Sequence, residues 1–203
     1  NTAAGDHAIS EDNSGFLSVT GPCNLVFPKD HGSHSGYRTE WWYYTGNLEA
    51  ETGNRYGFQL TFFRSQINAP ADEKRRPHPT SAWRARQIYL GHAAITDIFK
   101  KRHLQSELMA RGTLGMAGVS QEAMDTLVFI KNWSTKIGAD RHLLKTVTDD
   151  FSYELTLQPV KPPVLHGDMG YSRKRSTPER ASCYYSFTRL KTEGALTFGA
   201  KTI

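Results

Sequence analysis

The sequence predicts an all-β protein, built as an antiparallel sandwich or barrel, and two observations lead to this expectation. From Asn24 onward, segments of strand length are separated by turn residues at short, regular intervals. The segment 37–48, YRTEWWYYTGNL, also places four large rings at consecutive positions. Because alternate residues of a strand point to opposite faces, this strand must bury rings on both sides, which is typical of the wall of a closed barrel.

The remaining strands follow from the same alternation and from the turn residues that end each segment. We expect strands at 24–27, 39–50, 54–66, 84–98, 101–110, 126–133, 142–148, 151–158, 182–191 and 195–200. Glu51–Asn54 is expected to be the turn of a long hairpin, because Gly and Asn supply the positive φ that tight turns need. The segment 112–123 shows no alternation, and Gln121–Met124 is expected to close a short helix.

Glu40 is the exceptional residue of the aromatic strand, since it shares a face with Trp42 and Tyr44. Burying a carboxylate is costly unless it is paired, hydrogen-bonded or kept protonated. One interpretation is an acid set among rings for acid catalysis. The other is an ionic latch in which Glu40 pairs with one of three arginines. These are Arg38, Arg64 and Arg84.

Composition and charge narrow the class of protein. The chain has 203 residues, of which 38% are hydrophobic and 22% charged, as in an ordinary globular protein. Its formal net charge of +5 would suit an anionic partner only if the basic residues clustered. They are scattered, and the one dense run, 73–79, is flanked by prolines and is expected to be a solvated loop. We therefore expect no nucleic-acid partner, and no apolar run approaches the ~20 residues of a membrane span.

The start of the chain and its cysteines bear on its location. It begins at Asn1 with neither an initiator Met nor an apolar signal region, which is compatible with a removed leader and with export. Cys23 and Cys183 are too few for a disulfide framework, and a buried thiol is the commoner interpretation of each. A bridge between them requires that the two ends of the chain meet.

The chain divides into four parts by composition. We expect a flexible N-terminal arm at 1–20, a β-barrel at 21–160, a proline-rich linker at 161–180 and an aromatic hairpin at 181–203. One hairpin cannot bury its own apolar face. The last part must therefore pack on the barrel or begin a second domain.

Several blocks in order carry a family resemblance over about Asn24 to Leu190. They are LVFPKDHGSHSGYRTEWWYYTGNL, GFQLTFFR, SAWRARQIYLGHAAITD, VKPPVLHGDMGYSRK and ASCYYSFTRL. Together they resemble the bacterial predicted secreted hydrolases, a family grouped with AttH-like proteins and, more distantly, with carotenoid 1,2-hydratases of the hydroxyneurosporene synthase type.

This resemblance implies two packed lipocalin-like (calycin-type) barrels, commonly exported, so that a secreted or periplasmic location is expected. It also implies that the hydratase relatives add water across an isolated carbon–carbon double bond by acid catalysis, without a redox cofactor. Members of the family continue into a second barrel with a Trp-rich block, and this chain stops before it. On this basis 181–203 is expected to be the first hairpin of a second, incomplete lipocalin-like barrel.

The predicted site combines an acid, a histidine and ligand-binding side chains. Glu40 and His92 are the expected catalytic residues, although a lone His on an apolar strand is often a hydrogen-bonded structural residue. The expected ligand-binding residues are Trp41, Trp42, Tyr43, Gln59, Thr61, Phe63, Gln87, Tyr89, Asp168 and Tyr171. The polar members of this set can equally satisfy one another across neighbouring strands. The resemblance places Asp168 and Tyr171 at the interface between the barrels.

Two other chemistries receive little support from the sequence. Asp30–His34, DHGSH, has two imidazoles three residues apart but no third ligand at a fixed interval, so a surface loop is favoured over a metal site. No G-x-S-x-G elbow is present for a serine hydrolase. We expect neither a metal nor another cofactor.

The expected function is the binding of a hydrophobic, isoprenoid-like small molecule in a barrel cavity. In the full-length protein this binding would serve acid-assisted hydration or hydrolysis, by a hydratase (lyase) or hydrolase. The alternative is a non-catalytic lipocalin-like binding or carrier protein of the cell envelope. A third interpretation is a module that docks on another envelope protein.

Overall fold

The computed structural model describes residues 9–11, 15–75, 81, 83–174, 181–199 and 201–203. Its fold is all-β and antiparallel, which confirms the predicted fold class, with two short helical segments, η1 (Lys29–His31) and α1 (Pro70–Lys74). Among these residues, no helix is long and apolar enough to cross a membrane.

Four consecutive strands form the first sheet, in the order in which they follow in sequence. They are β3 (Thr39–Glu49), β4 (Arg55–Gln66), β5 (Gln87–Asp97) and β6 (Arg102–Arg111). The turn between β3 and β4 contains Gly53 at φ +79°, a conformation that Gly adopts without steric cost. The long hairpin predicted at 39–66 is therefore confirmed.

The second sheet has seven strands in the order β17-β16-β11-β10-β9-β8-β7. They are β7 (Ala117–Glu122), β8 (Asp125–Ile130), β9 (Trp133–Ile137), β10 (His142–Val147), β11 (Phe151–Pro159), β16 (Leu190–Phe198) and β17 (Lys201–Thr202). Three short pairs lie outside both sheets. They are β1 (Ile9–Glu11) with β2 (Leu17–Val19), β12 (Val164–Leu165) with β15 (Tyr185–Ser186), and β13 (Tyr171–Arg173) with β14 (Ala181–Cys183).

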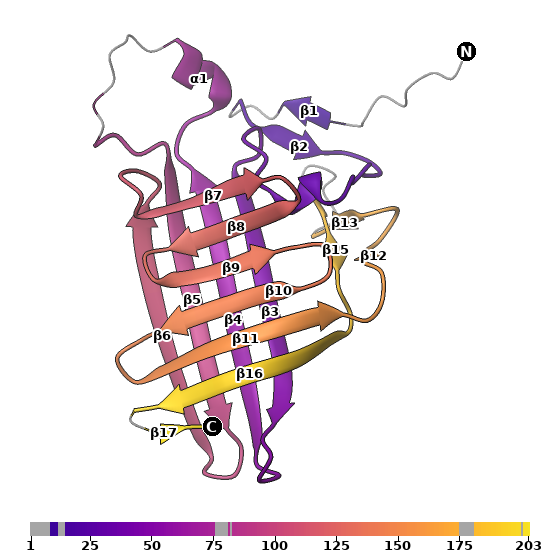
Figure 1. Cartoon of the computed structure of the whole chain (residues 1–203). Coiled ribbons are helices and arrows are strands. Elements are labelled where there is room, and N and C mark those ends of the chain that lie inside the picture. The colour runs from indigo at the N-terminus through magenta and orange to yellow at the C-terminus, as the bar shows by residue number, and fades with distance from the viewer. Residues whose placement is uncertain (1–8, 12–14, 76–80, 82, 175–180, 200) are drawn as a thin grey trace.

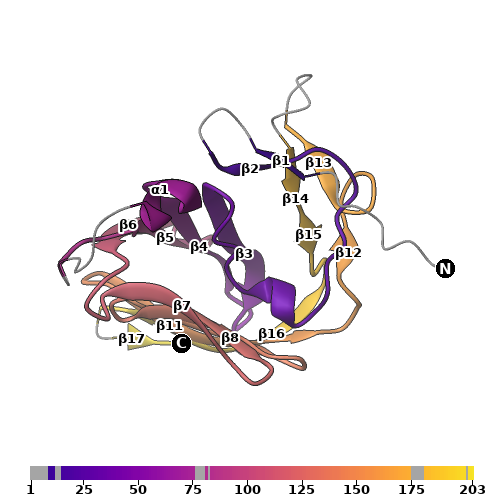
Figure 2. The same cartoon turned by 90° about the horizontal axis from the view of Figure 1, so that it is seen from above.

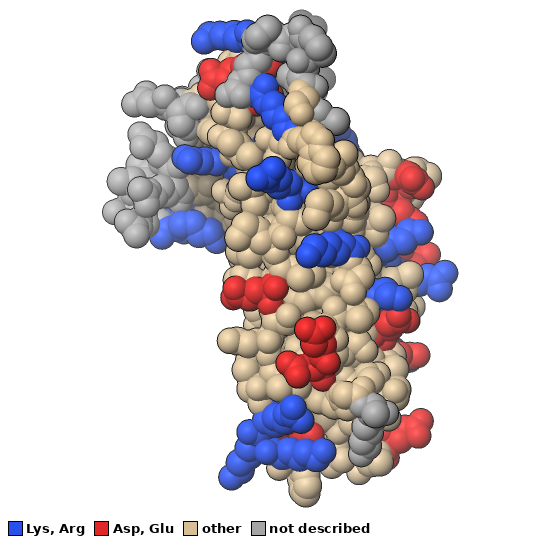
Figure 3. Space-filling view, turned by 90° about the vertical axis from the view of Figure 1, so that its left-hand side faces the viewer, with Lys and Arg blue, Asp and Glu red and all other residues tan. Residues whose placement is uncertain are grey.

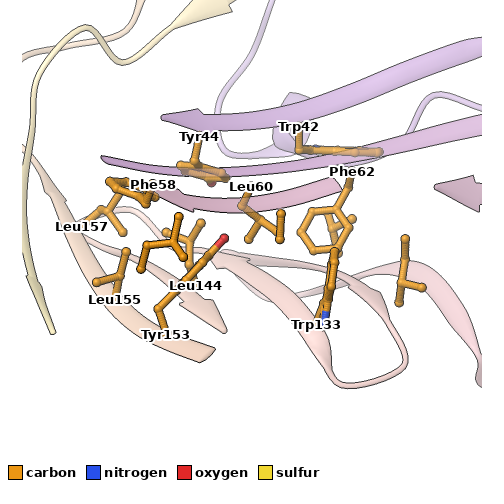
Figure 4. Packing of buried hydrophobic residues seen from close by; sticks show 14 of the residues in the cluster. Trp42, Tyr44, Phe58, Leu60, Phe62, Trp133, Leu144, Tyr153, Leu155 and Leu157 are labelled. Carbon is orange, nitrogen blue, oxygen red and sulfur yellow. The ribbon is translucent and has the colours of Figure 1, made fainter. Parts of the chain in front are cut away.

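The two large sheets pack face to face, and their strands cross steeply (Figure 1). Each strand turns alternate side chains inward, so that β4 contributes Phe58, Leu60 and Phe62 to the space between the sheets. The opposite sheet contributes Trp133, Leu144, Tyr153, Leu155 and Leu157, which meet the first set in Figure 4. The interior of the barrel is therefore filled by side chains.

The barrel is open, which corrects the expectation of a closed wall. Among the described residues, no ladder joins β3 or β6 to the seven-stranded sheet. β3 is therefore an edge strand of the first sheet, paired with β4 on one side only. Figure 2 shows this side of the molecule flanked by the N-terminal segment and by the segments that carry β12 to β15.

A disulfide ties these two flanking segments together. Cys23 and Cys183 are bonded with their Cα atoms 5.8 Å apart, although 160 residues separate them in sequence. The interpretation of both as buried thiols is therefore wrong, because the two ends of the chain do meet. Phe16 and Val19 from the predicted N-terminal arm are also buried, at 4% and 5% exposure.

Three local predictions were wrong, because the formation of a strand depends on pairing with other segments and not on the pattern of the segment alone. The segment expected to close a helix forms β7, whose Glu122 pairs with Asp125 of β8 across a turn in which Ala123 has φ +54°. β9 also forms, since both β8 and β10 pair with it. Residues 24–27 form no strand and lead instead into η1.

The last part of the chain contributes to the second sheet, where β16 pairs with β11 from Leu190 opposite Pro159 to Phe198 opposite Phe151. The domain boundaries at 160 and 180 stay a prediction. Residues 175–180 of the predicted linker and 76–79 of the basic run lie outside the described residues. Figure 3 shows Lys and Arg interspersed with Asp and Glu on the face beside β6, rather than gathered into one basic surface.

Candidate functional site

The open side of the barrel holds a cavity of about 790 Å³. It is bounded by β3, by parts of the segments 17–37 and 181–190, and by Ile137 and His142 of the second sheet. We call this space the seam cavity, because it lies where a closed barrel would join β3 to the other sheet. Its size is within the range of small-molecule sites.

A chain of hydrogen bonds fixes His142 at the wall of the cavity. The Thr135 hydroxyl donates to Tyr44 Oη at 3.1 Å, and Tyr44 Oη lies 3.0 Å from His142 Nδ1. All three residues are buried, and they come from strands in both sheets. This chain therefore bridges the two layers at the open side.

A second group of rings lies beside His142. His31 Nδ1 and Tyr185 Oη are 2.7 Å apart, and the Trp42 indole donates to the His31 carbonyl oxygen at 2.8 Å. The ring of Phe187 meets the His142 imidazole edge-on, with 5.0 Å between centroids. Residues separated by up to 154 positions in sequence thus form one aromatic wall.

Burial controls the protonation of this wall. Loss of hydration, with a smaller contribution from the nearby His31, lowers the pKa of His142 to about 4. Burial likewise lowers the pKa of His31 to about 4, against the opposing charge of Asp30. The pKa values of Tyr44 and Tyr185 are raised above the usual range of tyrosine, again mainly by burial. At neutral pH, the wall therefore consists of uncharged groups.

A charged cluster lies beside these rings, around Glu40. Arg64, which is fully buried, donates from Nε to Glu40 Oε2 at 2.7 Å. Its remaining nitrogens donate to Gln66 Oε1 at 3.1 Å and to the carbonyl oxygens of His34 and Tyr37 at 2.9 Å. Each of the three guanidinium nitrogens thus has at least one acceptor, as a buried charge requires.

Glu40 in turn holds His34. The carboxylate accepts the His34 backbone N–H at 2.9 Å and contacts His34 Nδ1 at 2.6 Å, while Asp30 Oδ1 lies 3.2 Å from Nε2. The hydrogen bond to Glu40 is the main cause that raises the pKa of His34. The hydrogen bonds to Glu40 and Asp30 therefore favour the protonated imidazole of His34.

The structure brings some of the predicted residues to the seam cavity. Glu40, Trp41, Trp42 and Tyr43 line it. Of the arginines weighed as partners of Glu40, Arg64 is the one that pairs with it.

The other predicted residues lie elsewhere. His92 lies on the outer face of the first sheet, where its ring contacts Phe63 and its Nε2 is 3.7 Å from Glu107. In the ladder, His92 is opposite Thr61, whereas Glu40 belongs to the opposite face. The remaining predicted ligand-binding residues also lie outside the lining. They are Gln59, Thr61, Phe63, Gln87, Tyr89, Asp168 and Tyr171. The structure does not bring Glu40 and His92 together, and the roles assigned to this set stay predictions.

Sequence reasoning missed four of the wall residues, His31, His142, Tyr185 and Phe187. His31 was assigned to a surface loop, but it is only 4% exposed because Trp42 and Tyr185 cover and bind it. The signals were present in the DHGSH segment and in the aromatic CYYSF segment. Neither segment shows by itself that the two meet.

Metal chemistry finds no support in this arrangement. Within the described ranges, no group of three or more His, Cys, Asp or Glu side chains is arranged to hold a metal ion. The site instead combines ring faces, neutral hydrogen-bonding groups and one imidazole–carboxylate pair.

The structure thus defines a class of protein: an open, antiparallel, lipocalin-like barrel with a cavity at its seam. The model of the AttH-like family matches residues 18–203. The chain therefore belongs to the AttH-like family. No curated protein matches the chain.

Two solved structures are similar to this chain. A protein assigned as AttH from Nitrosomonas europaea has 30% sequence identity and a TM-score of 0.72, over 88% of this chain and 51% of that one. Kievitone hydratase from Nectria haematococca has 11% identity and a TM-score of 0.61, over 97% of this chain and 52% of that one. The second likeness concerns the fold alone. The chain spans about half the length of each of these proteins.

Proposed function

We propose that the protein binds a hydrophobic small molecule with an isoprenoid-like body in the seam cavity. The observation that carries this proposal is a cavity of about 790 Å³ whose lining combines rings from three distant segments with polar and charged side chains, among them His34 and Glu40. Such a lining is typical of sites that bury most of a small ligand. Membership of the AttH-like family, which has a hydratase among its structural neighbours, supports the same function.

In the full-length protein, the proposed reaction is acid-assisted hydration or hydrolysis. Hydration needs a proton donor, ring faces that stabilise a developing cation, and a group that accepts a proton from water. In the proposed step, His34 gives its proton to one carbon of a double bond while the oxygen of water bonds to the other. The proton that water then releases returns to the His34 imidazole. Glu40 keeps His34 charged before the reaction.

The disulfide supports an exported location for this activity. Disulfides persist in oxidising compartments such as the bacterial periplasm and are rare in the cytosol. The bond between Cys23 and Cys183 joins two walls of the seam cavity, and both residues line it. An oxidising compartment would therefore preserve the shape of the site.

Binding is tested with the neutral fluorescent dye N-phenylnaphthylamine. Ser182 lines the cavity, so Ser182→Phe fills part of it and should reduce dye affinity by at least tenfold. Gln105 is exposed on β6, so Gln105→Phe adds the same ring at the surface and should leave the affinity unchanged. Equal affinities of the two variants would place the dye outside the cavity.

Turnover is tested with the full-length protein, farnesol and isotopically labelled water. Mass spectrometry should detect label in the product, and both His34→Gln and Glu40→Gln should reduce the rate. Undiminished turnover in Glu40→Gln would remove this residue from the mechanism.

One observation favours a non-catalytic carrier as the second candidate function. Glu40 and Arg64 are satisfied by each other and by neighbouring groups, as in an ionic latch that only fixes the wall. A carrier would release farnesol chemically unchanged and without label after prolonged incubation. Labelled product would exclude this alternative.

A further inference from the structure

We propose that Nε2 of His142 is the polar anchor of the seam cavity, and that it binds a neutral oxygen acceptor, a carbonyl or hydroxyl group, on an otherwise apolar ligand. This inference rests on the proposed function, because it concerns the same cavity. It adds the feature by which the cavity would select among hydrophobic molecules.

This nitrogen has no hydrogen-bond partner in the part of the chain that the structure describes. His142 lines the cavity and is only 2% exposed, yet its Nε2 makes no hydrogen bond to any described residue. Buried polar atoms are nearly always hydrogen-bonded, because an unmade bond in a buried place is costly. A ligand oxygen at this position would supply the missing bond.

The hydrogen bonds around His142 determine which ring nitrogen carries the hydrogen. Tyr44 Oη accepts the hydrogen of Thr135, which leaves its own hydrogen for His142 Nδ1. Nδ1 then acts as the acceptor, and in a neutral imidazole the hydrogen resides on Nε2. The unpartnered atom is therefore a donor, and it is complementary to an oxygen acceptor.

The surroundings of His142 favour an uncharged ligand group. The groups around His142 are the uncharged rings of His31, Tyr44, Tyr185 and Phe187. Burial that lowers the pKa of His142 to about 4 keeps the imidazole neutral as well. A carboxylate placed here would lose its hydration without gaining an opposite charge, which is strongly unfavourable. For a ketone, an aldehyde or an alcohol, the free-energy cost of losing hydration is far smaller.

Access to Nε2 requires a small movement of the wall. The Phe187 ring lies edge-on to His142, and this half-buried side chain belongs to the segment 181–190 that covers the seam. A change of its rotamer would bring a ligand oxygen within reach, and rotamer changes at binding surfaces are common. Ser182 Oγ, a second lining atom without a partner among the described residues, offers a further polar contact.

The test uses three naphthalenes of similar shape: acetylnaphthalene, which carries a ketone, ethylnaphthalene, which carries none, and naphthoate, which is an anion. Their affinities for the full chain are measured by displacement of N-phenylnaphthylamine. We expect the ketone to bind about tenfold more tightly than the hydrocarbon, as one neutral hydrogen bond provides. The anion should bind most weakly.

Two variants distinguish the effect of the His142 hydrogen bond on affinity from the effect of the shape of the cavity. His142→Leu removes the donor and should reduce the ketone preference to about one, with the hydrocarbon affinity within about twofold of wild type. His142→Gln restores an N–H donor and should retain the preference. Circular dichroism and the hydrocarbon affinity report whether each variant is folded.

A measurement on the wild-type chain keeps the inference open to refutation if a variant does not fold. In the NMR spectrum, the Nε2–H resonance of His142 should shift on addition of acetylnaphthalene and stay in place with ethylnaphthalene. Equal shifts, equal affinities of ketone and hydrocarbon, or tightest binding of naphthoate would each overturn the anchor alone. Absence of binding by all three compounds would overturn the proposed function together with it.

Discussion

Replacing His142 with asparagine tests whether the buried wall of the seam cavity makes the protein sensitive to acid. The side-chain amide of the His142→Asn variant retains an oxygen that accepts from Tyr44, so the hydrogen-bond chain from Thr135 is kept. The variant lacks the titrating imidazole. Any change in the pH dependence of stability therefore reports the protonation of His142.

The magnitude follows from the pKa of His142, which burial lowers from 6.5 to about 4. Below pH 6.5, the unfolded chain binds a proton that the native protein does not bind, so stability falls as the pH falls toward 4. For one such histidine, the linkage relation gives a loss of about 2 kcal/mol between pH 7 and pH 5. His31, whose pKa is also lowered to about 4, remains in the variant. Its own contribution to the loss of stability at acidic pH is therefore the same in both proteins.

The raised pKa of His34 acts in the opposite sense and in a different range. Its stabilising contribution is complete below pH 6.5 and is lost as the pH rises through the raised pKa of His34 in the native protein. His34 is present in both proteins, so it does not affect their difference.

The assay is urea unfolding of both proteins at pH 7, 6 and 5. Wild type should lose about 2 kcal/mol more than His142→Asn over this interval. His103→Asn, which replaces an exposed histidine of β6, serves as the control and should keep the wild-type dependence. Parallel curves for wild type and His142→Asn would refute the argument that His142 is neutral and buried in the native state.

Three further changes probe the disulfide, the charged cluster and the core, all by urea unfolding. The disulfide closes a loop of 160 residues, so the double variant Cys23→Ser, Cys183→Ser should lower the free energy of unfolding by up to about 5 kcal/mol. Reduction of wild type should have the same effect. An unchanged free energy of unfolding would contradict the pairing. Glu40→Gln leaves the charge of Arg64 buried without its partner and should cost roughly 3–5 kcal/mol, whereas a cost below about 1 kcal/mol would indicate a solvated pair. Leu60→Ala, at a side chain with 0% exposure, should cost about 3 kcal/mol but leave dye affinity unchanged, because Leu60 does not line the cavity; weakened dye binding would place the dye between the sheets.

The strands of the first sheet were predictable from the sequence because each has its own local signal. In β4, the large apolar side chains of Tyr56, Phe58, Leu60 and Phe62 stand at alternate positions, and Gly53 marks the turn before it. β7 has no such signal. It is a strand only because β8 pairs with it, and the sequence of a segment does not contain information about its partner.

The candidate site was predictable only where it coincides with one strand. Glu40, Trp41, Trp42 and Tyr43 are adjacent in sequence, and all four line the seam cavity. His92 was chosen for the space beside its ring, but strand alternation places it on the other face of the sheet. Strand parity alone does not identify the lining, because Trp41 and Tyr43 share the face of His92 and yet line the cavity.

The rest of the site depends on contacts that periodicity cannot encode. Tyr44 meets His142 across 98 positions, and His31 meets Tyr185 across 154. Both contacts exist because the edge of β3 is left without a neighbouring strand, so that the N-terminal and C-terminal segments cover it and the disulfide joins them. If the barrel were closed, a strand would occupy the space where the cavity now lies. The open seam is therefore the structural cause of the cavity, and it explains why the filled interior and the binding site are in different places.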